Sequence, residues 1–595
     1  MNHFLKRATL SILVLSAGIA SAKHPKVAPD ISGTASGAMV NVIVQYVRAP
    51  SGSHHRKVTN RGGRLVADLS GIVNASAYSM PANAVNALAD DAEVEYVVPD
   101  RPVHAKLDYA NPTVNANLAL QHGFNGAGVG IAVIDSGIDD RPDLTKSKPG
   151  DPSSVSRVIA ERSFLPGRPS TSDEYGHGTH IAGILAGNGF RSTGSGYTRS
   201  FIGIAPNAKL INYRVLDENG GGTDSGVIAA IRQAILDKDR YDIRVINLSL
   251  GRPVVEDYTK DVLCRAVEAA WRAGIVVVVA AGNEGRNDTF GTSGYGTIMS
   301  PGNSPYVITV GAMKDMSTNP RGDDLVASYS SKGPTQIDHI VKPDLVAPGN
   351  RIISLARPGN GLYTQSDEMN LVPNAYYTSG GTGTSTNYFK LSGTSMAAPM
   401  VSGAAALMIE KDPSLTPDQV KARLMKTATK EFPAFSVAVD PLTGASYTSQ
   451  YDIFTVGAGY LDVWAALNNS DRAEGSALSP TADFDASTGN VYIRNTLDRG
   501  AGSAMWGTSA VWGNSAVWGN SAVWGNQVFV NGNSAVWGNS AVWGNSAVWG
   551  NTALAGYSAV WGNSAVWGNS AVWGNSAVWG NSAVWGNGVA LRGEN

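Results

Sequence analysis

The sequence is almost free of cysteine, because Cys264 is the only one among 595 residues. An internal disulfide bond is therefore excluded. Cys264 lies in "TKDVLCRAVEAAW", at an apolar position of a helical pattern. That position favours a buried structural thiol, with a reactive thiol as the alternative.

An excess of charge of either sign is also missing. The formal net charge is −2, which gives no electrostatic reason to expect a nucleic acid or an anionic membrane as a partner. Beyond the N-terminus, no segment is long and apolar enough to cross a membrane. At this length one ordinary core is not enough, so we expect several domains.

The N-terminus, "MNHFLKRATLSILVLSAGIASAKHP", has the layout of a secretory signal peptide. Lys6 and Arg7 form a basic region, an apolar run follows, and residues 20–22 fit the A-x-A cleavage pattern. The apolar run is too short to span a bilayer comfortably. We therefore predict a signal peptide over residues 1–22 and a protein that is secreted, either extracellular or on the cell surface. An uncleaved anchor is the alternative.

A small α+β unit is predicted next. Residues 39–46, "MVNVIVQY", alternate and are rich in valine, which is typical of a strand. "GRLVADLS" and "VEYVVPD" are two further strand candidates. "PANAVNALADD" has helical spacing, with Pro81 placed to start the helix. Together these segments predict a folded unit over about residues 30–103, followed by a connector.

From about residue 126 to residue 312, strands alternate with helices. The predicted strands are "VGIAVID", "KLINYRVL", "RVINLSLG", "GIVVVVAAG" and "YVITVGA". This alternation predicts an α/β fold with a parallel, doubly wound sheet. In such a sheet, functional residues lie at the carboxyl ends of the strands and at the N-termini of the helices that follow. "GAGYLDVWAALNN" closes the domain near residue 470, and residues 471–500 are predicted to be a polar linker.

Three segments combine a strand or turn, a reactive side chain and small residues. "GIAVIDSGID" places Asp135 at the end of an apolar strand. "YGHGTHIAGILAG" places His177, and "LSGTSMAAPM" places Ser395, at the start of a helix rich in alanine and glycine. The N-terminus of a helix offers N–H groups that have no partner within the helix. A serine becomes a nucleophile when a base takes its proton and a third group orients the base.

Ser395, His177 and Asp135 fit those three roles. The developing oxyanion needs a donor, which "VVVVAAGNEG" offers as Asn283 at the end of a buried strand. Taken singly, Asp135 could be a helix cap and His177 a core histidine. Taken together, the residues favour a nucleophilic site. His180, one helical turn beyond His177, is interpreted as structural.

These segments resemble the subtilisin family of serine proteases, the subtilases. The order Asp, His, Ser is that of the family, and "GIAPNAKLINYRVL", "VINLSLG", "SYSSKGP" and "VKPDLVAPG" extend the resemblance over about residues 110–468. The resemblance implies a serine endopeptidase that hydrolyses proteins or peptides through an acyl-enzyme. It also implies the role of each residue: Asp135 orients the base, His177 is the general base and acid, Ser395 is the nucleophile, and Asn283 forms the oxyanion hole with the Ser395 backbone N–H.

The resemblance further implies where a substrate binds. Two segments would flank the substrate main chain as added strands, namely Ser249, Leu250 and Gly251 in "SLG" and Gly220, Gly221 and Gly222 in "ENGGG". Relatives often have a small residue at the base of the first specificity pocket. Here Met299 stands there, and it would keep the pocket apolar and adaptable.

No metal or cofactor is predicted. The segment "GNGFRSTGSGYTRSFIGIAP" is longer than the corresponding calcium loop of many relatives, and it lacks a clear set of carboxylates. The chemistry of a serine nucleophile needs no cofactor, so a structural calcium ion is the one metal that is left open.

The N-terminal unit is similar to the inhibitory propeptide of the same family, with "VNVIVQY" and "VEYVVPDRPV" as the matching strands. The resemblance implies a propeptide over residues 23–109, which assists folding and inhibits the enzyme, and a catalytic domain over residues 110–470. Maturation is predicted between about His104 and Asn111. The bond between Tyr109 and Ala110 is preferred, because a large apolar side chain before the cut suits an apolar first pocket.

Residues 501–595 form a tail built from the hexapeptide "SAVWGN". Twelve of the fourteen tryptophans lie there, and no charged residue occurs between Arg499 and Arg592. Disordered chains combine low hydrophobicity with high net charge, and the tail has the opposite character. An even period places every tryptophan on the same face of a strand, and Gly-Asn supplies turns. The repeat therefore favours a β-solenoid, with a disordered, self-associating tract as the alternative.

Two functions compete. The first is a secreted endopeptidase whose propeptide inhibits it and whose tail self-associates or binds a surface. The second is a catalytically silent protease scaffold that serves as an adhesion or binding protein through its tail. The complete set of Asp135, His177, Ser395 and Asn283 argues against the second function. The sequence does not name the physiological substrate.

Overall fold

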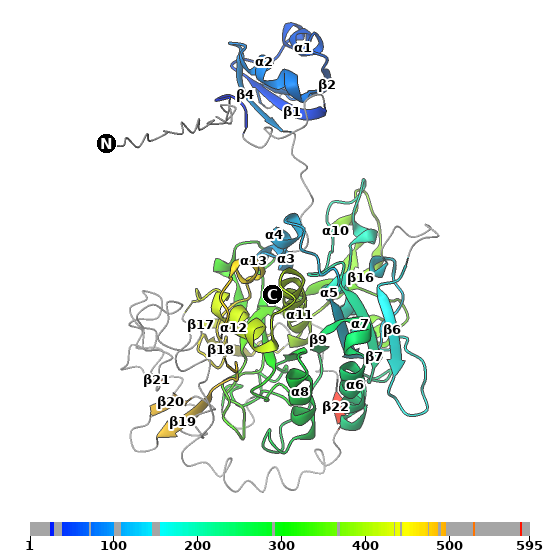
Figure 1. The fold of residues 1–595 in the computed structure, drawn as a ribbon, viewed down its shortest axis with the longest axis vertical. Helices are drawn as coiled ribbons and strands as arrows, with labels where there is room; N and C mark the ends of the chain where they lie inside the picture. Colours follow the sequence, from blue (N-terminus) through cyan, green and yellow to red (C-terminus); the bar gives the residue numbers. More distant parts are fainter. Residues whose placement is uncertain are drawn as a thin grey trace, which may run out of the picture. The chain divides into compact units, whose positions relative to one another are not determined.

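The structure is a computed structural model of the chain. It describes residues 24–28, 38–70, 73–99, 109–145, 155–287, 292–365, 369–433, 435–440, 443–473, 475–485, 490–494, 528–529 and 583–585. The predicted signal peptide and most of the repeat tail, including its predicted solenoid, lie outside the described residues. The chain divides into two compact units, residues 1–104 and 105–595 (Figure 1). None of the helices in the described part combines the length and apolar character that a membrane crossing requires.

The first unit contains an antiparallel sheet in the order β2-β3-β1-β4. Its elements are β1 (Met39–Tyr46), α1 (Gly52–Thr59), β2 (Arg64–Asp68), β3 (Ala75–Pro81), α2 (Val85–Ala89) and β4 (Val94–Pro99). Alternate valines of β1, Val42 and Val44, are buried with Leu88 of α2 in one apolar cluster. Strand β3, "ASAYSMP", was not predicted because its residues are small or polar. It is buried because it pairs with a strand on each side.

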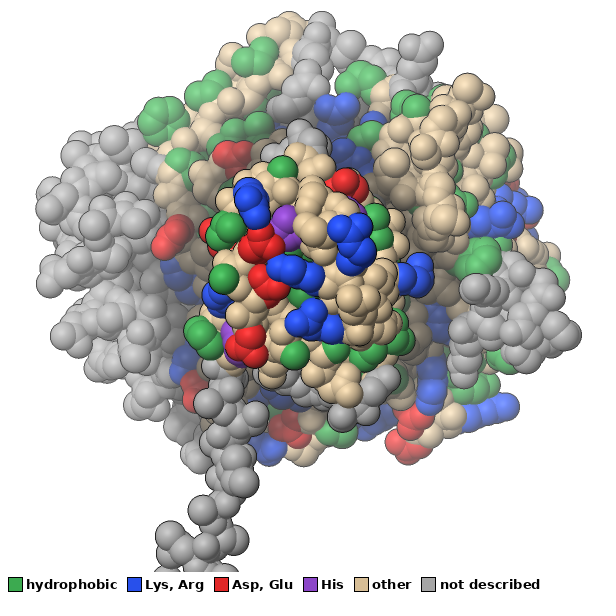
Figure 2. Space-filling model, turned by 90° about the horizontal axis from the view of Figure 1, so that it is seen from above, with side chains coloured by type: hydrophobic (Ala, Val, Ile, Leu, Met, Phe, Trp, Pro, Cys, Tyr) green, Lys and Arg blue, Asp and Glu red, His purple; other side chains and the backbone are tan. Residues whose placement is uncertain are grey.

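Figure 2 shows acidic and basic side chains intermixed on the side of the first unit that faces the viewer. In the first unit, Lys57 Nζ lies 2.7 Å from a carboxylate oxygen of both Asp91 and Glu93. Such mixing agrees with the near-neutral net charge of the sequence. It gives this face no strong field of one sign that would attract a polyanion.

The second unit is built on a sheet that, within the described residues, has eight strands. Their order is β12-β11-β10-β9-β5-β7-β6, with β13 beside β11. The strands are β5 (Gly130–Asp135), β6 (Val158–Ser163), β7 (Lys209–Arg214), β9 (Ile243–Leu248), β10 (Val276–Ala280), β11 (Ile308–Lys314), β12 (Leu325–Val326) and β13 (Leu345–Pro348). Apart from β11 and β12, the paired strands run parallel. The predicted parallel α/β sheet is confirmed.

Five longer helices accompany the sheet: α5 (His177–Ala186), α6 (Asp224–Leu236), α8 (Val262–Arg272), α11 (Thr394–Lys411) and α12 (Pro417–Thr427). α5 packs against α11, and α6 packs against α8. The central strands β5 and β10 are buried at every residue. This burial is why their sequences are continuous apolar runs rather than alternating ones.

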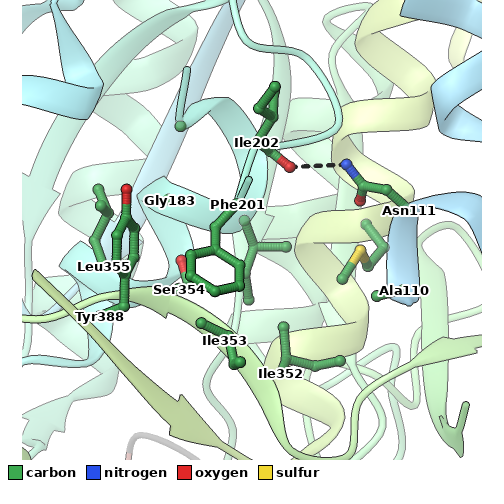
Figure 3. Close-up of a pocket in the computed structure, with 13 residues that line it drawn as sticks. Ala110, Asn111, Gly183, Phe201, Ile202, Ile352, Ile353, Ser354, Leu355 and Tyr388 are labelled. Carbon is green, nitrogen blue, oxygen red and sulfur yellow. Dashed lines mark hydrogen bonds between the residues drawn. The ribbon is translucent and has the colours of Figure 1, made fainter. Parts of the chain in front are cut away.

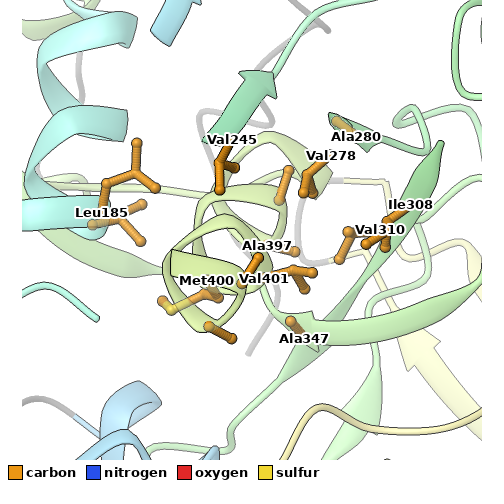
Figure 4. Packing of buried hydrophobic residues seen from close by; sticks show 14 of the residues in the cluster. Leu185, Val245, Val278, Ala280, Ile308, Val310, Ala347, Ala397, Met400 and Val401 are labelled. Carbon is orange, nitrogen blue, oxygen red and sulfur yellow. The ribbon is translucent and has the colours of Figure 1, made fainter. Parts of the chain in front are cut away.

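Helix α11 runs through the core, and every residue from Thr394 to Ile409 is buried. Figure 4 shows Ala397, Met400 and Val401 surrounded by side chains of β9, β10, β11, β13 and α5. The helix consists mostly of small residues because it is enclosed on all sides. At Gly403 a Cβ would lie 2.5 Å from Ile204, so a larger residue there would push the helix away.

The remaining elements of the second unit are short. They are α3 (Ala110–Thr113), α4 (Ala116–Gln121), β8 (Gly221–Thr223), α7 (Lys238–Tyr241), β14 (Ile352–Leu355), α9 (Gly361–Gln365), β15 (Leu371–Pro373), α10 (Asn374–Tyr377), β16 (Thr384–Leu391), β17 (Phe435–Val439), β18 (Ser446–Gln450), α13 (Val463–Asn468), β19 (Thr481–Asp485), β20 (Asn490–Arg494), β21 (Val528–Phe529) and β22 (Ala583–Trp585). In the repeat tail, β21 pairs with β20, and β22 pairs with β8.

Part of the predicted linker, 471–500, packs against this unit. The Pro480 carbonyl accepts a hydrogen bond from the Val341 N–H at 2.8 Å, and the Ala482 N–H donates to His339 O at 2.7 Å. Ser479 is fully buried, and its Oγ donates to Asp344 Oδ1 at 2.6 Å. The chain therefore makes structural contacts with the α/β unit beyond residue 470.

Asp344 is the centre of a buried charge cluster. Its carboxylate lies 2.6 Å from Lys342 Nζ and 3.2 Å from Lys421 Nζ, and both lysines are fully buried. Burial alone would raise the pKa of Asp344, but the two ammonium groups hold it below its usual range. The cluster joins the start of β11, helix α12 and the segment around Ser479. Removal of the one carboxylate would leave two buried cations without compensation.

We predict that Asp344→Asn lowers the free energy of unfolding by about 3–5 kcal/mol, since it breaks a buried ion cluster. The matched control is Asp242→Asn, which breaks the exposed pair with Lys209 and should cost at most about 1 kcal/mol. Urea unfolding of both variants, in a Ser395→Ala background that prevents self-digestion, provides the comparison. Equal losses in the two variants would contradict a structural role of the cluster.

Candidate active site

The three candidate catalytic residues stand at the ends of regular elements. Asp135 is the last residue of β5, His177 is the first of α5, and Ser395 is the second of α11. The fold brings these ends together, because β5 ends at the carboxyl edge of the parallel sheet and α5 packs against α11. All three residues are buried.

Asp135 and His177 form a buried hydrogen-bonded pair. His177 Nδ1 lies 2.7 Å from Asp135 Oδ1. A carboxylate can only accept, so Nδ1 carries the proton and Nε2 presents its lone pair. Nε2 is buried, and within the described part of the chain it has no hydrogen-bond partner. The pair therefore holds a base nitrogen ready to accept a proton from a neighbouring group.

Opposing effects set the pKa of His177. Burial lowers this pKa because it penalises the charged imidazolium, while the charge and hydrogen bond of Asp135 raise it. Asp173 also raises it, and the net result is a pKa above the usual 6.5. His177 thus binds a proton more readily than an isolated histidine does, as suits a residue that accepts a proton and later returns it.

Asp173 supports the pair through Ser136. Ser136 donates its N–H to Asp135 Oδ1 at 2.7 Å and its Oγ–H to Asp173 Oδ1 at 2.7 Å. Asp173 also accepts hydrogen bonds at 2.6 and 2.7 Å from backbone N–H groups around the start of α5. Burial raises the pKa of Asp173 to about 6. Sequence reasoning missed this residue, because an acidic residue in "STSDEYGHG" is equally typical of an exposed turn.

Ser395 is linked to the segment after β9. Its Oγ–H donates to Ser249 O at 3.2 Å, and Ser249 Oγ–H donates to Ser395 O at 2.8 Å. Asn247 Nδ2 donates to Ser249 Oγ at 3.0 Å, which extends the network into the sheet. Ser395 Oγ and His177 Nε2 are not hydrogen-bonded to each other in this structure. Such bonds are often long or misaligned in enzymes without substrate.

Asn283 follows β10 and lies beside the start of α11. Its Oδ1 accepts hydrogen bonds from Thr394 N at 2.9 Å and Thr394 Oγ1 at 3.1 Å. These bonds fix the orientation of the amide. A Cβ at position 393 would lie 3.1 Å from Asn283 Nδ2, so Gly393 gives the amide its room. A side-chain N–H donor is thereby held near the first N–H groups of α11.

The predicted substrate-binding residues occupy three neighbouring segments. The structure places Ser249, Leu250 and Gly251 directly after β9, Met299 beside the end of β10, and Gly220, Gly221 and Gly222 at β8. Met299 N donates to Ala281 O at 3.0 Å, and a Cβ at Gly282 would lie 2.9 Å from Met299 Cγ. Met299 therefore packs next to the residue that precedes Asn283.

Strand β8 requires its glycines. Gly220 has φ +77°, and a Cβ there would lie 2.7 Å from the ring of Tyr175. A Cβ at Gly222 would lie 2.6 Å from a main-chain carbonyl oxygen. Arg252 Nε lies 3.1 Å from the Asp224 carboxylate at the start of α6. This ion pair connects the end of β8 with the segment that follows β9.

His180 is held as a neutral side chain. Its Nε2 lies 3.2 Å from Ile352 O and 3.3 Å from Phe389 O. Burial, and next the charge of His177, lower the pKa of His180 to about 3. A neutral imidazole with these two carbonyl neighbours connects α5 to β14 and β16. This geometry suits a structural role.

The long loop that resembles a calcium loop ends beside an apolar pocket. Figure 3 shows Phe201, Ile202, Ile352, Ile353 and Leu355 around this pocket, with Asn111 Nδ2 donating to Ile202 O at 2.7 Å. The lining contains no carboxylate, and within the described residues no group of three or more His, Cys, Asp or Glu side chains is suited to a metal ion. Calcium binding stays an open expectation.

Comparisons with known proteins agree with this geometry. The model of the subtilase family matches residues 126–445. Serine protease AprX of Bacillus subtilis (strain 168) is 37% identical over 364 residues, which are 60% of this chain and 74% of that protein. Subtilisin E of the same strain is 34% identical over 390 residues, or 65% and 83% of the two chains. The alkaline protease of Shouchella clausii is 32% identical over 348 residues, or 58% and 71%.

The chain belongs to the subtilase family. It is therefore a subtilisin-like serine endopeptidase, as predicted, and its substrates are proteins. Subtilases need no cofactor for catalysis. The matched region covers the α/β sheet and all three candidate catalytic residues, and excludes the first unit and the repeat tail.

We predict that His177 of this subtilase titrates above pH 6.5 and that Asp135→Asn lowers its pKa, because the neutral amide removes the stabilising charge. The folded pKa is raised, so His177 contributes stability that is full below its unfolded pKa and is lost as pH rises through the folded pKa. Nuclear magnetic resonance titration of the Ser395→Ala protein measures this, with His180 as a control that stays neutral. A His177 midpoint that Asp135→Asn leaves unchanged would contradict the pairing.

Proposed function

We propose that this subtilase is a secreted endopeptidase, made as an inactive precursor, with Ser395 as its nucleophile, His177 as its base and Asp135 as the group that orients the base. The observation that carries the proposal is the 2.7 Å hydrogen bond between Asp135 Oδ1 and His177 Nδ1. It fixes the tautomer in which Nε2 is the base. Secretion and the precursor rest on the sequence of residues 1–109.

The proposed reaction proceeds in two halves. Ser395 Oγ attacks the carbonyl carbon of the scissile peptide bond, and its proton moves to His177 Nε2. The C–N bond then breaks as the imidazolium returns that proton to the leaving amine, and the acyl group stays on Ser395 as an ester. A water molecule then attacks the ester and gives its proton to His177, which acts again as the base. His177 returns the proton to Ser395 Oγ as the acid, and the carboxylate product is released. Asp135 stays ionised throughout and stabilises the imidazolium.

The attack requires the Ser395 hydroxyl to change its hydrogen-bond partner. The Ser395 hydroxyl now donates its hydrogen bond to Ser249 O, and it must turn toward His177 Nε2 when a substrate is bound. The oxyanion that forms would accept hydrogen bonds from Asn283 Nδ2 and from the Ser395 backbone N–H. Thr394 holds the other end of the Asn283 amide, so this donor needs no reorganisation during the reaction.

The substrate main chain would lie as an added strand between β8 and the segment after β9. Ser249, Leu250 and Gly251 would form one side and Gly220, Gly221 and Gly222 the other. Met299 would form the base of the first pocket and favour an apolar side chain before the scissile bond. The Arg252–Asp224 ion pair supports this arrangement because it ties the two sides together.

The first unit would act as an inhibitory propeptide over residues 23–109. Its antiparallel sheet with two helices supports this assignment, since an independently folded unit ahead of the protease suits a folding assistant. The competing function, a silent scaffold that adheres through its repeat tail, is not favoured. Adhesion does not require a buried Asp135–His177 pair in which His177 Nε2 has no hydrogen-bond partner among the described residues. Self-association or surface binding by the tail is compatible with either function.

We predict that Ser395→Ala abolishes hydrolysis of a generic protein substrate and leaves the precursor uncleaved, because no nucleophile remains. Electrophoresis and N-terminal sequencing of the purified protein measure both effects. Wild-type protein should instead begin near Ala110, after loss of the first unit. The matched control is Ser402→Ala, which removes a buried hydroxyl of the same helix that bonds Asn247 and should keep activity. Activity that persists in Ser395→Ala would require another nucleophile.

We predict that Asn283→Ala lowers kcat by about 10²–10³-fold with little change in KM, because the amide acts mainly on the transition state. This magnitude is the one known for the side-chain donor of subtilisin. Steady-state kinetics on a peptide substrate separate kcat from KM. An unchanged kcat would remove Asn283 from the oxyanion hole.

A further inference from the structure

One strand of the repeat tail pairs with strand β8. Ala583, Val584 and Trp585 form β22, which runs antiparallel to β8. The register places Val584 opposite Gly222. Figure 1 shows β22, in red, next to α6, the helix that follows β8. Within the described residues, these two strands form a sheet of their own.

Strand β8 offers main-chain groups along one edge, to which another strand can pair. Asp217 fixes it from one end, because Asp217 N donates to Gly221 O at 2.8 Å and Gly221 N donates to Asp217 Oδ1 at 2.9 Å. The glycines of β8 leave room for another backbone to approach closely. An extended segment of any sequence can bind such an edge through main-chain hydrogen bonds. A substrate and a tail repeat would use the same groups.

We propose that the SAVWGN tail binds its own β8 edge as a substrate mimic and competes there with extended substrates. The proposal rests on the proposed function, which assigns β8 to the substrate main chain. Asp217 already bonds both main-chain groups of Gly221, so the edge at Gly222 is the one left for an added strand. β22 on that edge leaves no place for a substrate strand. The tail would therefore lower the fraction of molecules that are competent to bind a substrate.

The composition of the tail suits this role. Ala-Val-Trp occurs eleven times, and no charged residue occurs between Arg499 and Arg592. A neutral strand can lie on β8 without the cost of desolvating a charge. Each copy offers the same three residues on the same chain, so the local concentration of the ligand is high. The chain between β20 and β22, residues 495–582, can span up to about 3.3 Å per residue, so it is long enough to reach from β20 to β8.

The test compares three proteins that share the same catalytic unit. The first is the complete chain, and the second ends after residue 500. The third is complete but has proline in place of valine in each of the eleven Ala-Val-Trp copies, which removes an N–H and disfavours strand pairing. An extended tetrapeptide anilide reports on binding at β8. A small activated ester, which needs no strand binding, reports on the catalytic centre alone.

We predict that KM for the anilide is at least about fivefold higher in the complete chain than in the shortened one, with equal kcat. This factor corresponds to a β8 edge that is free of the tail in about one-fifth of the molecules. The proline chain should behave like the shortened one, and all three should hydrolyse the ester equally. Equal KM in the complete and shortened chains, or a proline chain that matches the complete one, would overturn the proposal. A KM difference that disappears on dilution would also overturn it, because the tail would then bind a second copy.

A binding measurement separates this proposal from the proposed function. Calorimetry uses the shortened Ser395→Ala chain after wild-type enzyme has cut it in trans and the first unit has been removed. The peptide SAVWGNSAVWGN should bind this chain, and SAPWGNSAPWGN should not bind. This result needs no turnover. Loss of ester hydrolysis in all three proteins would refute the catalytic assignment, while the absence of peptide binding would refute tail docking.

Discussion

The hydrogen bond between His177 Nδ1 and Asp135 Oδ1 is the contact on which the site depends. It requires the end of β5 and the start of α5 to meet, and two glycines make this meeting possible. A Cβ at Gly178 would lie 2.1 Å from Gly137 O, and Gly137 itself has φ +118°. Any side chain at either position would push the helix from the strand. The dry surroundings then strengthen the bond, because little water competes for the carboxylate.

Helix α11 extends the same principle to Ser395, the proposed nucleophile. It lies among four strands and α5, so its residues are small, and Ser395 at its start is placed by packing along its whole length. The link between Ser395 and Ser249 ties this helix to the end of β9. The bond from Thr394 to Asn283 ties it to the end of β10. The proposed nucleophile, base and oxyanion donor thus come from separate elements that one core holds in register.

The sequence predicted five of the buried strands of the sheet, but not the four-residue β13, which is also buried throughout. The five central strands were visible as apolar runs, and the reactive residues were visible because each follows such a run or begins a helix of small residues. The edge strand β6, "VIAERS", was missed because half of it is exposed and carries Glu161 and Arg162. An edge strand buries too little surface to leave an apolar run.

Long-range polar contacts could not be predicted. Ser479 reaches Asp344 across a large separation in sequence, and Asp173 supports Asp135 through the hydroxyl of Ser136. Such partners have no period and no local signal. The repeat tail presents the opposite difficulty. Its period predicts a strand, but eleven equal copies give no indication of the surface to which one of them pairs.

These observations agree with an endopeptidase whose proposed catalytic groups are brought together by the fold. Ser395 is the residue on which the account rests, and a serine-directed fluorophosphonate tests it most directly, since the reagent forms a stable bond only with an activated hydroxyl. After incubation and digestion, mass spectrometry should find the label on Ser395, and His177→Ala should prevent labelling. A label on another residue, or labelling of Ser395 at an unchanged rate in His177→Ala, would contradict the account.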